Sequence, residues 1–193
     1  LWLFDDGAVR ETPFLSLAGR VTGLLGEQGL FTATLEPEER ATERGGPRHL
    51  VVAFTEERSN AVVVAAYPLL PDGSGADRQG EQVLLRVPVR EPFHHGGQVL
   101  FGPDGMLYAS IGDGQRDALY LHEVPHVSQD LSSLRGKVLR IDRFPPGGAP
   151  YAVPDDNPFT AASDPAAAAA GARGEVWALG LRNPWKLTFA PSD

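Results

Sequence analysis

Short apolar runs separated by clusters of Gly, Pro and Asp recur along the whole chain. The runs are rich in Val, Leu, Phe and Tyr, which is typical of β-strands, and the residues between them are typical of turns. We therefore predict strands at residues 31–35, 49–55, 61–67, 82–89, 98–101, 106–111, 137–142 and 175–179, with a further one starting at Lys186. No segment has helical periodicity over about a dozen residues, and residues 166–170 are expected to form either a low-complexity surface insertion or a single helical turn.

The predicted strands fall into groups of about four, and each group opens with an apolar strand that runs into a proline, at Pro37, Pro103 and Pro191. Four-stranded antiparallel groups with a weak internal repeat favour a β-propeller. The distances between these prolines exceed the ~40–50 residues of a compact blade, and loop insertions at 113–136 and 143–174 explain the excess. A β-sandwich is the alternative fold, because it also has short strands joined by Gly/Pro turns.

Composition excludes several classes of function. The chain has 193 residues, a formal net charge of −8 and no cluster of Lys and Arg, which argues against a protein that binds nucleic-acid phosphates. There is no cysteine, so neither a disulfide framework nor a thiolate metal site is expected. No apolar run approaches the ~20 residues that a membrane-spanning helix needs.

Candidate chemistry is concentrated around a predicted hairpin that begins after His94-His95-Gly96-Gly97 and ends before Gly112-Asp113-Gly114. Two adjacent histidines in extended backbone point to opposite faces, so only one of them can face a cleft. We place His94 and Asp113 near opposite ends of two paired strands, so that a neighbouring loop has to fold over for both to reach one site. A neutral imidazole is suited to removing a hydroxyl proton at neutral pH.

Five segments, in one order along the chain, resemble the glucose/sorbosone dehydrogenase family, the soluble quinoprotein aldose dehydrogenases. The segments are residues 26–30, 94–114, 129–142, 154–159 and 175–185. The resemblance implies an all-β fold, with this chain a fragment of roughly two to three blades of a six-bladed β-propeller. It further implies oxidation of an aldose at the anomeric carbon to the lactone, with pyrroloquinoline quinone (PQQ) as cofactor and an unidentified electron acceptor. Calcium, with ligands expected after Asp193, and a periplasmic or secreted location follow from the same resemblance.

The resemblance also implies roles for particular residues. His94 holds the position of the catalytic base, and Arg182 and Asn183 match a pair that lies against PQQ. Asp113 matches an aspartate beside the histidine and the sugar, where it would bind substrate or orient His94. Glu27 holds a position from which a side chain reaches the substrate in some relatives, although those relatives have an amide there.

Both ends of the chain are abrupt, which leads us to expect a segment of a longer protein. An apolar strand is predicted to start at Leu1, and residues 187–189 form the last apolar run before Pro191. In blade terms, residues 1–20 would end one blade, 21–95 and 96–185 would form two more, and 186–193 would start the next. Blades bury their faces on each other, so the fragment is expected to need the remainder of the propeller for stability.

Two other classes of function stay open, a non-enzymatic extracellular binding module similar to the hedgehog-interacting proteins and a calcium-dependent propeller lactonase. A propeller can lose its chemistry and keep its fold, but a pure scaffold would not need the four residues His94, Asp113, Arg182 and Asn183 together. Residues 122–126 match the zinc pattern His-Glu-x-x-His, but Pro125 is incompatible with the continuous helix which that site requires. Residues 155–158 could hold calcium, and we favour a turn there.

Overall fold

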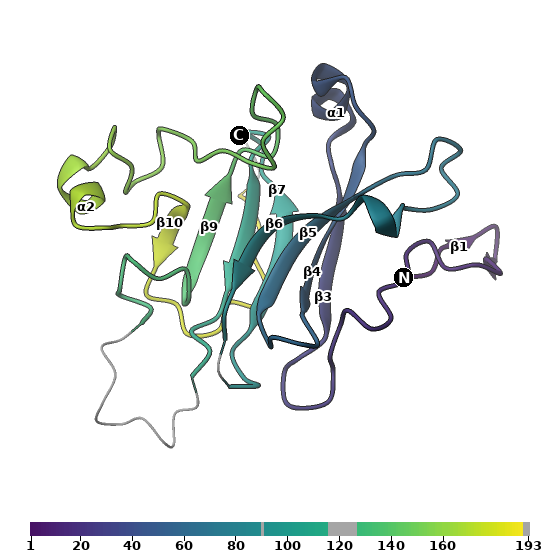
Figure 1. Cartoon of the computed structure of the whole chain (residues 1–193), viewed down its shortest axis with the longest axis horizontal. Helices are drawn as coiled ribbons and strands as arrows, with labels where there is room; N and C mark the ends of the chain where they lie inside the picture. Colours follow the sequence, from purple (N-terminus) through teal and green to yellow (C-terminus); the bar gives the residue numbers. More distant parts are fainter. Residues whose placement is uncertain (90, 116–126, 191–193) are drawn as a thin grey trace.

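Two four-stranded antiparallel sheets form most of the structure, a computed structural model that describes residues 1–89, 91–115 and 127–190 (Figure 1). The first sheet contains β3 (Leu30–Leu35), β4 (His49–Thr55), β5 (Val62–Pro68) and β6 (Gln82–Val87). The second contains β7 (Gly96–Phe101), β8 (Leu107–Ile111), β9 (Lys137–Ile141) and β10 (Val176–Leu179). Within each sheet every strand pairs with its neighbour in the sequence, which is the meander of a propeller blade. The predicted all-β class is confirmed.

The sheets are joined through their first strands, β3 and β7. The Thr32 hydroxyl of β3 donates to the Gly97 carbonyl over 2.8 Å and accepts from the Val99 amide over 2.9 Å. Gly97 allows this approach, because a Cβ atom at that position would lie 2.2 Å from the Phe31 ring. The contact fixes how the two sheets stack and aligns the loops that lead into β3 and β7.

The core is buried on both faces of β4. Val51 and Ala53 pack into a cluster shared with the second sheet, which includes Leu107 and Leu139. Their neighbours Val52 and Phe54 pack with Leu15 and Leu17 of the N-terminal segment on the opposite face. A strand buried on both faces needs an uninterrupted apolar run rather than strict alternation, and residues 50–54 have one.

Three short elements depart from the sequence predictions. The N-terminal strand begins at Phe4, not at Leu1, as a small hairpin of β1 (Phe4–Asp5) and β2 (Ala8–Val9). Helix α1 (Glu38–Arg44) was not predicted, because only Ala41 is buried and the helix has no apolar periodicity. Its signals are local ones, with Pro37 at the N-cap and Gly45 in the left-handed conformation at the C-cap.

Of the two alternatives for residues 166–170, a surface insertion or a single helical turn, the structure shows the short helix α2 (Pro165–Ala169), capped by the Asp164 side chain. A short 3₁₀ helix (Arg78–Gly80) precedes β6. No strand forms at residues 186–190 of the described chain. A segment becomes a strand only when its backbone pairs with a neighbour, and the Leu187 amide donates instead to the Gln98 side chain.

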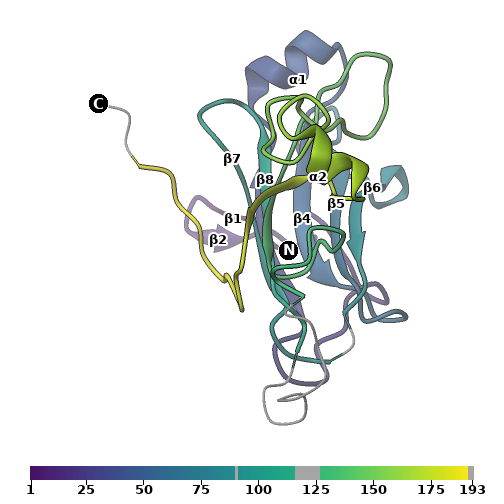
Figure 2. The ribbon, with the colours of Figure 1, turned by 90° about the vertical axis from the view of Figure 1, so that its left-hand side faces the viewer.

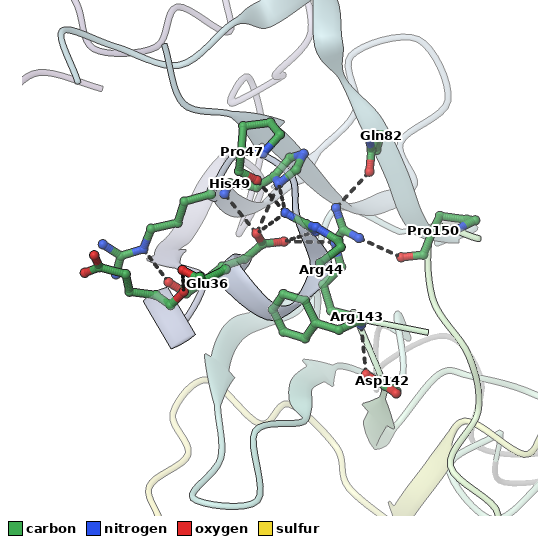
Figure 3. A network of polar contacts seen from close by, with 12 residues as sticks. Glu36, Arg44, Pro47, His49, Gln82, Asp142, Arg143 and Pro150 are labelled. Atoms are coloured by element: carbon green, nitrogen blue, oxygen red, sulfur yellow. Dashed lines mark hydrogen bonds and ion pairs between the residues drawn. The ribbon is translucent and has the colours of Figure 1, made fainter. Parts of the chain in front are cut away.

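A buried ionic cluster, which we call the Glu36 cluster, lies at the α1 end of the sheets (Figure 3). Glu36 directly follows β3 and is 0% exposed. Its carboxylate accepts from the backbone amide of His49 over 2.9 Å and forms ion pairs with Arg44 and Arg143 over 3.0 and 3.2 Å. Because Arg143 follows β9 of the second sheet, the cluster ties the two sheets together.

A cavity of about 680 Å³ adjoins the Glu36 cluster and is lined by Arg40, Arg44, His49 and Arg143 among others. Its guanidinium groups pair with Glu36, Glu43 and Asp142. Because these charges are already paired, we assign a structural role to this cavity.

Candidate active site

His94 and Asp113 lie at the same end of the β7–β8 hairpin, so their predicted placement near opposite ends is wrong. β7 and β8 are antiparallel, and Gly96 pairs with Ile111, which brings the residue before β7 next to the residue after β8. The Gly114 amide donates to the His94 carbonyl over 3.1 Å. A Cβ atom on Gly112 would lie 1.9 Å from that same carbonyl oxygen, so the close approach requires glycine. No covering loop is needed to bring the two side chains together.

The His94 imidazole is oriented by Asp113. His94 Nδ1 lies 2.7 Å from Asp113 Oδ1, and both side chains are largely buried. The carboxylate can only accept, so Nδ1 carries the hydrogen and Nε2 of the neutral ring presents its lone pair. The Gln115 amide also donates to Asp113 Oδ1 over 3.0 Å, which fixes the carboxylate in turn. The arrangement is that of a general base held in one tautomer.

His94 itself has a left-handed backbone, with φ of 55°. This conformation is uncommon for a residue other than glycine and has to be maintained by its surroundings. Glu27 Oε2 accepts from the His94 amide over 2.8 Å, and the Glu27 amide donates to the Pro92 carbonyl over 2.8 Å. The loop before β3 therefore holds the loop before β7.

His95 has a structural environment. It is 0% exposed, its Nε2 lies 2.9 Å from the Glu91 carbonyl, and its Nδ1 lies 3.0 Å from the Thr55 hydroxyl. The carbonyl only accepts, so Nε2 carries the hydrogen and Nδ1 accepts from Thr55. Burial lowers the pKa of His95, which keeps the ring neutral. Both ring nitrogens are thus used internally, and His94 is the histidine of the pair that is suited to chemistry.

The Arg182–Asn183 segment lies against the same hairpin end. The Asp113 amide donates to the Arg182 carbonyl over 2.8 Å, and the Arg182 side chain is exposed. Asn183 Oδ1 accepts from the Gly96 amide over 3.1 Å, and Asn183 Nδ2 donates to Glu27 Oε2 over 2.8 Å. Figure 2 shows residues 180–190, drawn in yellow, running along the edge of the molecule where β7 lies. The structure therefore brings together Glu27, His94, Asp113 and Asn183, with the backbone of Arg182 beside them.

A buried lysine, Lys137, fixes the loop that contacts the Arg182–Asn183 segment. Lys137 is 0% exposed and donates to the carbonyls of Val127, Ser128 and Arg135 over 2.7–3.0 Å. Burial lowers the pKa of Lys137 to about 8. These carbonyls belong to the loop at residues 127–136. This loop contacts the residue before Arg182, because the Gly136 carbonyl accepts from the Leu181 amide over 3.1 Å.

A pocket of about 270 Å³ opens beside Glu27. It is lined by Glu27, Leu30, Phe31, Thr32, Gly96, Gln98, Trp185 and Lys186. Gln98 and Lys186 were not predicted as site residues. Strand alternation could not have located Gln98, because the register of β7 shifts between Gly96 and Val99.

The structure also bears on the predictions about metal sites and membrane spans. Within residues 1–89, 91–115 and 127–190, no three His, Asp or Glu side chains gather closely enough to hold a metal ion. In the same part of the chain, no helix is long and apolar enough to cross a membrane. The His-Glu-x-x-His pattern at 122–126 lies outside the described residues. Asp156 and Asn157 both bind the Arg140 guanidinium, over 2.7 and 2.8 Å, as expected of a structural turn.

The two four-stranded meanders, with the His–Asp pair and the Arg–Asn segment at one end, are blades of a β-propeller of the sugar dehydrogenase type. The sequence model of the family described as Glucose / Sorbosone dehydrogenase matches residues 24–193. The chain belongs to this family, which confirms the resemblance and the propeller fold.

Relatives within the family differ in what their names describe. The chain is 26% identical over 169 residues to the aldose sugar dehydrogenase YliI of Escherichia coli, covering 86% of this chain and 38% of that protein. It is 29% identical over 194 residues to the human Hedgehog-interacting protein, covering 94% of this chain and 26% of that protein. The HIPL1 protein of Arabidopsis thaliana is 38% identical over 109 residues, which is 51% of this chain and 14% of that protein.

Solved structures give the same fold. A putative oxidoreductase (glucose dehydrogenase) of Thermus thermophilus is 30% identical with a TM-score of 0.68, and the match covers 94% of this chain and 46% of that one. The PQQ-bound aldose sugar dehydrogenase of Streptomyces coelicolor is 28% identical with a TM-score of 0.58, covering 93% of this chain and 43% of that one. The chain thus spans less than half the length of each of these proteins.

Proposed function

We propose that the protein oxidises an aldose at its anomeric carbon to the lactone, using PQQ as the hydride acceptor. The observation that carries this proposal is the 2.7 Å contact between His94 and Asp113, which leaves a basic nitrogen at a site that also contains Asn183. A base beside hydrogen-bond donors is what removal of a proton together with a hydride requires. Membership of the sugar dehydrogenase family and the PQQ-bound relative support the choice of substrate and cofactor.

The residues present fit a planar quinone that carries carbonyl and carboxylate groups. Arg182 and Asn183 carry N–H donors beside the base. The pocket next to Glu27 adds the Lys186 cation and the aromatic rings of Phe31 and Trp185. Such donors bind oxyanions and carbonyl oxygens, and aromatic rings pack against planar ligands. Arg182 and Asn183 would hold the cofactor, which when bound supplies the acceptor for a hydride, that is, for one proton and two electrons.

His94 Nε2 would take the proton of the anomeric hydroxyl while a hydride leaves the anomeric carbon, so that the aldose loses two protons and two electrons in all and becomes the lactone. The Asp113 carboxylate would stabilise the imidazolium that forms and could also contact the sugar. The Arg182 and Asn183 donors would stabilise the carbonyl oxygen of the cofactor that gains negative charge. Glu27 lines the pocket beside the base. An external electron acceptor would then remove the two electrons.

Calcium, held by residues after Asp193, and a periplasmic or secreted location belong to the same proposal. The Hedgehog-interacting relative, similar over 94% of this chain, favours the binding module as the second candidate. The presence of His94, Asp113, Arg182 and Asn183 together supports the enzyme over the binding module, since a scaffold has no need of them.

The test is reconstitution of the full-length protein with PQQ and calcium, followed by addition of aldoses and a dye as electron acceptor. We expect a change in quinone absorbance on binding and sugar-dependent dye reduction. A protein that binds no quinone and reduces no dye would contradict the proposal and favour the binding module. Lactone hydrolysis without dye reduction would favour the lactonase.

The Asp113→Asn substitution is expected to lower kcat for sugar oxidation by about 10²-fold or more, because loss of the carboxylate that holds a catalytic histidine in its correct tautomer costs up to about 10⁴-fold. The amide can present its NH₂ group to His94 Nδ1, which would favour the wrong tautomer. Quinone affinity, measured by absorbance titration, should stay within about threefold of wild type. An Asp113→Asn variant with wild-type kcat would show that this carboxylate does not orient the base.

A further inference from the structure

Glu27 contacts two functional segments through a single oxygen atom. Its Oε2 accepts from the backbone amide of His94 and from the side-chain amide of Asn183, each over 2.8 Å. These partners lie 67 and 156 residues further along the chain. One belongs to the residue proposed as the base and the other to a residue proposed to bind the cofactor.

The Asn183 side chain is fully oriented by these contacts. Its Oδ1 accepts from the Gly96 amide over 3.1 Å, so its Nδ2 is the atom that faces Glu27. Gly96 lies two residues after His94, and the chain from His94 to Gly96 therefore closes a ring with Asn183 and Glu27. In such a ring, movement of one member displaces the others.

The position of Glu27 is itself fixed by backbone. The Glu27 amide donates to the Pro92 carbonyl, and a Cβ atom on Gly26 would lie 2.1 Å from that carbonyl oxygen. The loop before β3 is therefore pressed against the loop before β7, at a place where only glycine fits. This gives the carboxylate a rigid support, which a residue that only reached toward a ligand would not need.

We propose that Glu27 is a positioning residue that couples the base to the cofactor-binding amide. Its carboxylate accepts from the His94 backbone amide and from Asn183 Nδ2, and so it holds these two groups at a fixed distance from each other. A charged oxygen accepts two N–H donors more strongly than a neutral one. The inference rests on the proposed function and goes beyond a substrate contact, because it concerns the arrangement of the site before the sugar binds.

The test compares Glu27→Ala and Glu27→Gln with wild type in the full-length protein. A Gln side chain keeps an oxygen that can accept both bonds, whereas Ala removes the acceptor. We expect Glu27→Ala to weaken PQQ binding and to lower kcat, each by about 10–100-fold, with the KM for sugar within about threefold. Glu27→Gln should recover both quantities to within about threefold to tenfold. The exposed Glu57, which lies between β4 and β5, provides the control Glu57→Ala, and no change is expected there.

A second readout uses the protein without cofactor. Amide hydrogen exchange of a peptide covering residues 92–100 should be faster in Glu27→Ala than in wild type and near wild type in Glu27→Gln. An increase in KM alone, with PQQ affinity and exchange unchanged, would overturn the inference and leave a substrate contact only. Equal loss in both variants together with a lowered melting temperature would reduce Glu27 to a fold requirement. If the wild-type protein binds no quinone, the proposed function is wrong and the inference is wrong with it. That result is distinguished from failure of the inference alone, in which wild type binds quinone and Glu27→Ala binds it equally well.

Discussion

The His94→Asn substitution is expected to lower kcat for sugar oxidation by about 10²–10⁴-fold, the usual contribution of a general base. Asparagine tolerates the left-handed backbone that His94 adopts, with φ of 55°, so the loop should keep its shape. The hydrogen bond to Glu27 is also retained, because the backbone amide of residue 94 donates it. The substitution therefore removes the proton acceptor and its contact with Asp113 and keeps the backbone of the loop.

Steady-state dye reduction with saturating PQQ and calcium measures the effect. Quinone binding and the melting temperature of the His94→Asn protein should match wild type, which separates loss of the base from loss of the fold. A variant that keeps more than about a tenth of the wild-type kcat would show that another group accepts the proton.

The Glu36→Gln substitution is expected to lower the free energy of unfolding by about 3–5 kcal/mol, because it removes one partner of a buried ion network. The Arg143 side chain is only 3% exposed, and its guanidinium would stay buried without a compensating carboxylate. The amide would also turn N–H donors toward Arg44 or Arg143, which offer only donors. The Glu36 cluster joins residues from both sheets, so the loss should affect the contact between them (Figure 3).

A matched control is Glu43→Gln on α1, which makes the same carboxylate-to-amide change at the surface. The Glu43 side chain is 66% exposed and lies 3.4 Å from Arg40, so a change within about 0.5 kcal/mol is expected. Denaturant unfolding of the full-length protein measures both variants. Equal effects of the two substitutions would contradict the structural role of the Glu36 cluster.

The pH dependence follows from the pKa of Glu36. Burial by itself raises this pKa, but hydrogen bonds from His49 and Arg44 outweigh it, and the pKa lies below the ordinary value of 4.5. The unfolded chain thus takes up the proton first as the pH falls, so the stability from Glu36 is present above about pH 4.5 and is lost as the pH falls through the folded-state pKa. The stability difference between wild type and Glu36→Gln should therefore narrow in acid.

Local pattern was sufficient to predict most of the strands. The predicted strand at residues 49–55 coincides with β4, and the other seven strands of the two sheets fall within two residues of their predicted bounds. These runs are apolar and often β-branched, and they end at turn residues, so their conformation follows from neighbours in the sequence. Helix α1 was missed because it is stabilised by its caps and exposed charges rather than by an apolar face.

The sequence by itself determined the class of fold and, through its motifs, the candidates Glu27, His94, Asp113, Arg182 and Asn183. Only the tertiary structure decided that the Asp113 carboxylate orients the imidazole of His94, and that a single Glu27 oxygen joins His94 to Asn183. Hydrogen bonds over 67 and 156 residues depend on how the sheets stack and on where glycine permits close approach. Such contacts arise from packing between distant segments, and spacing along the chain carries no record of them.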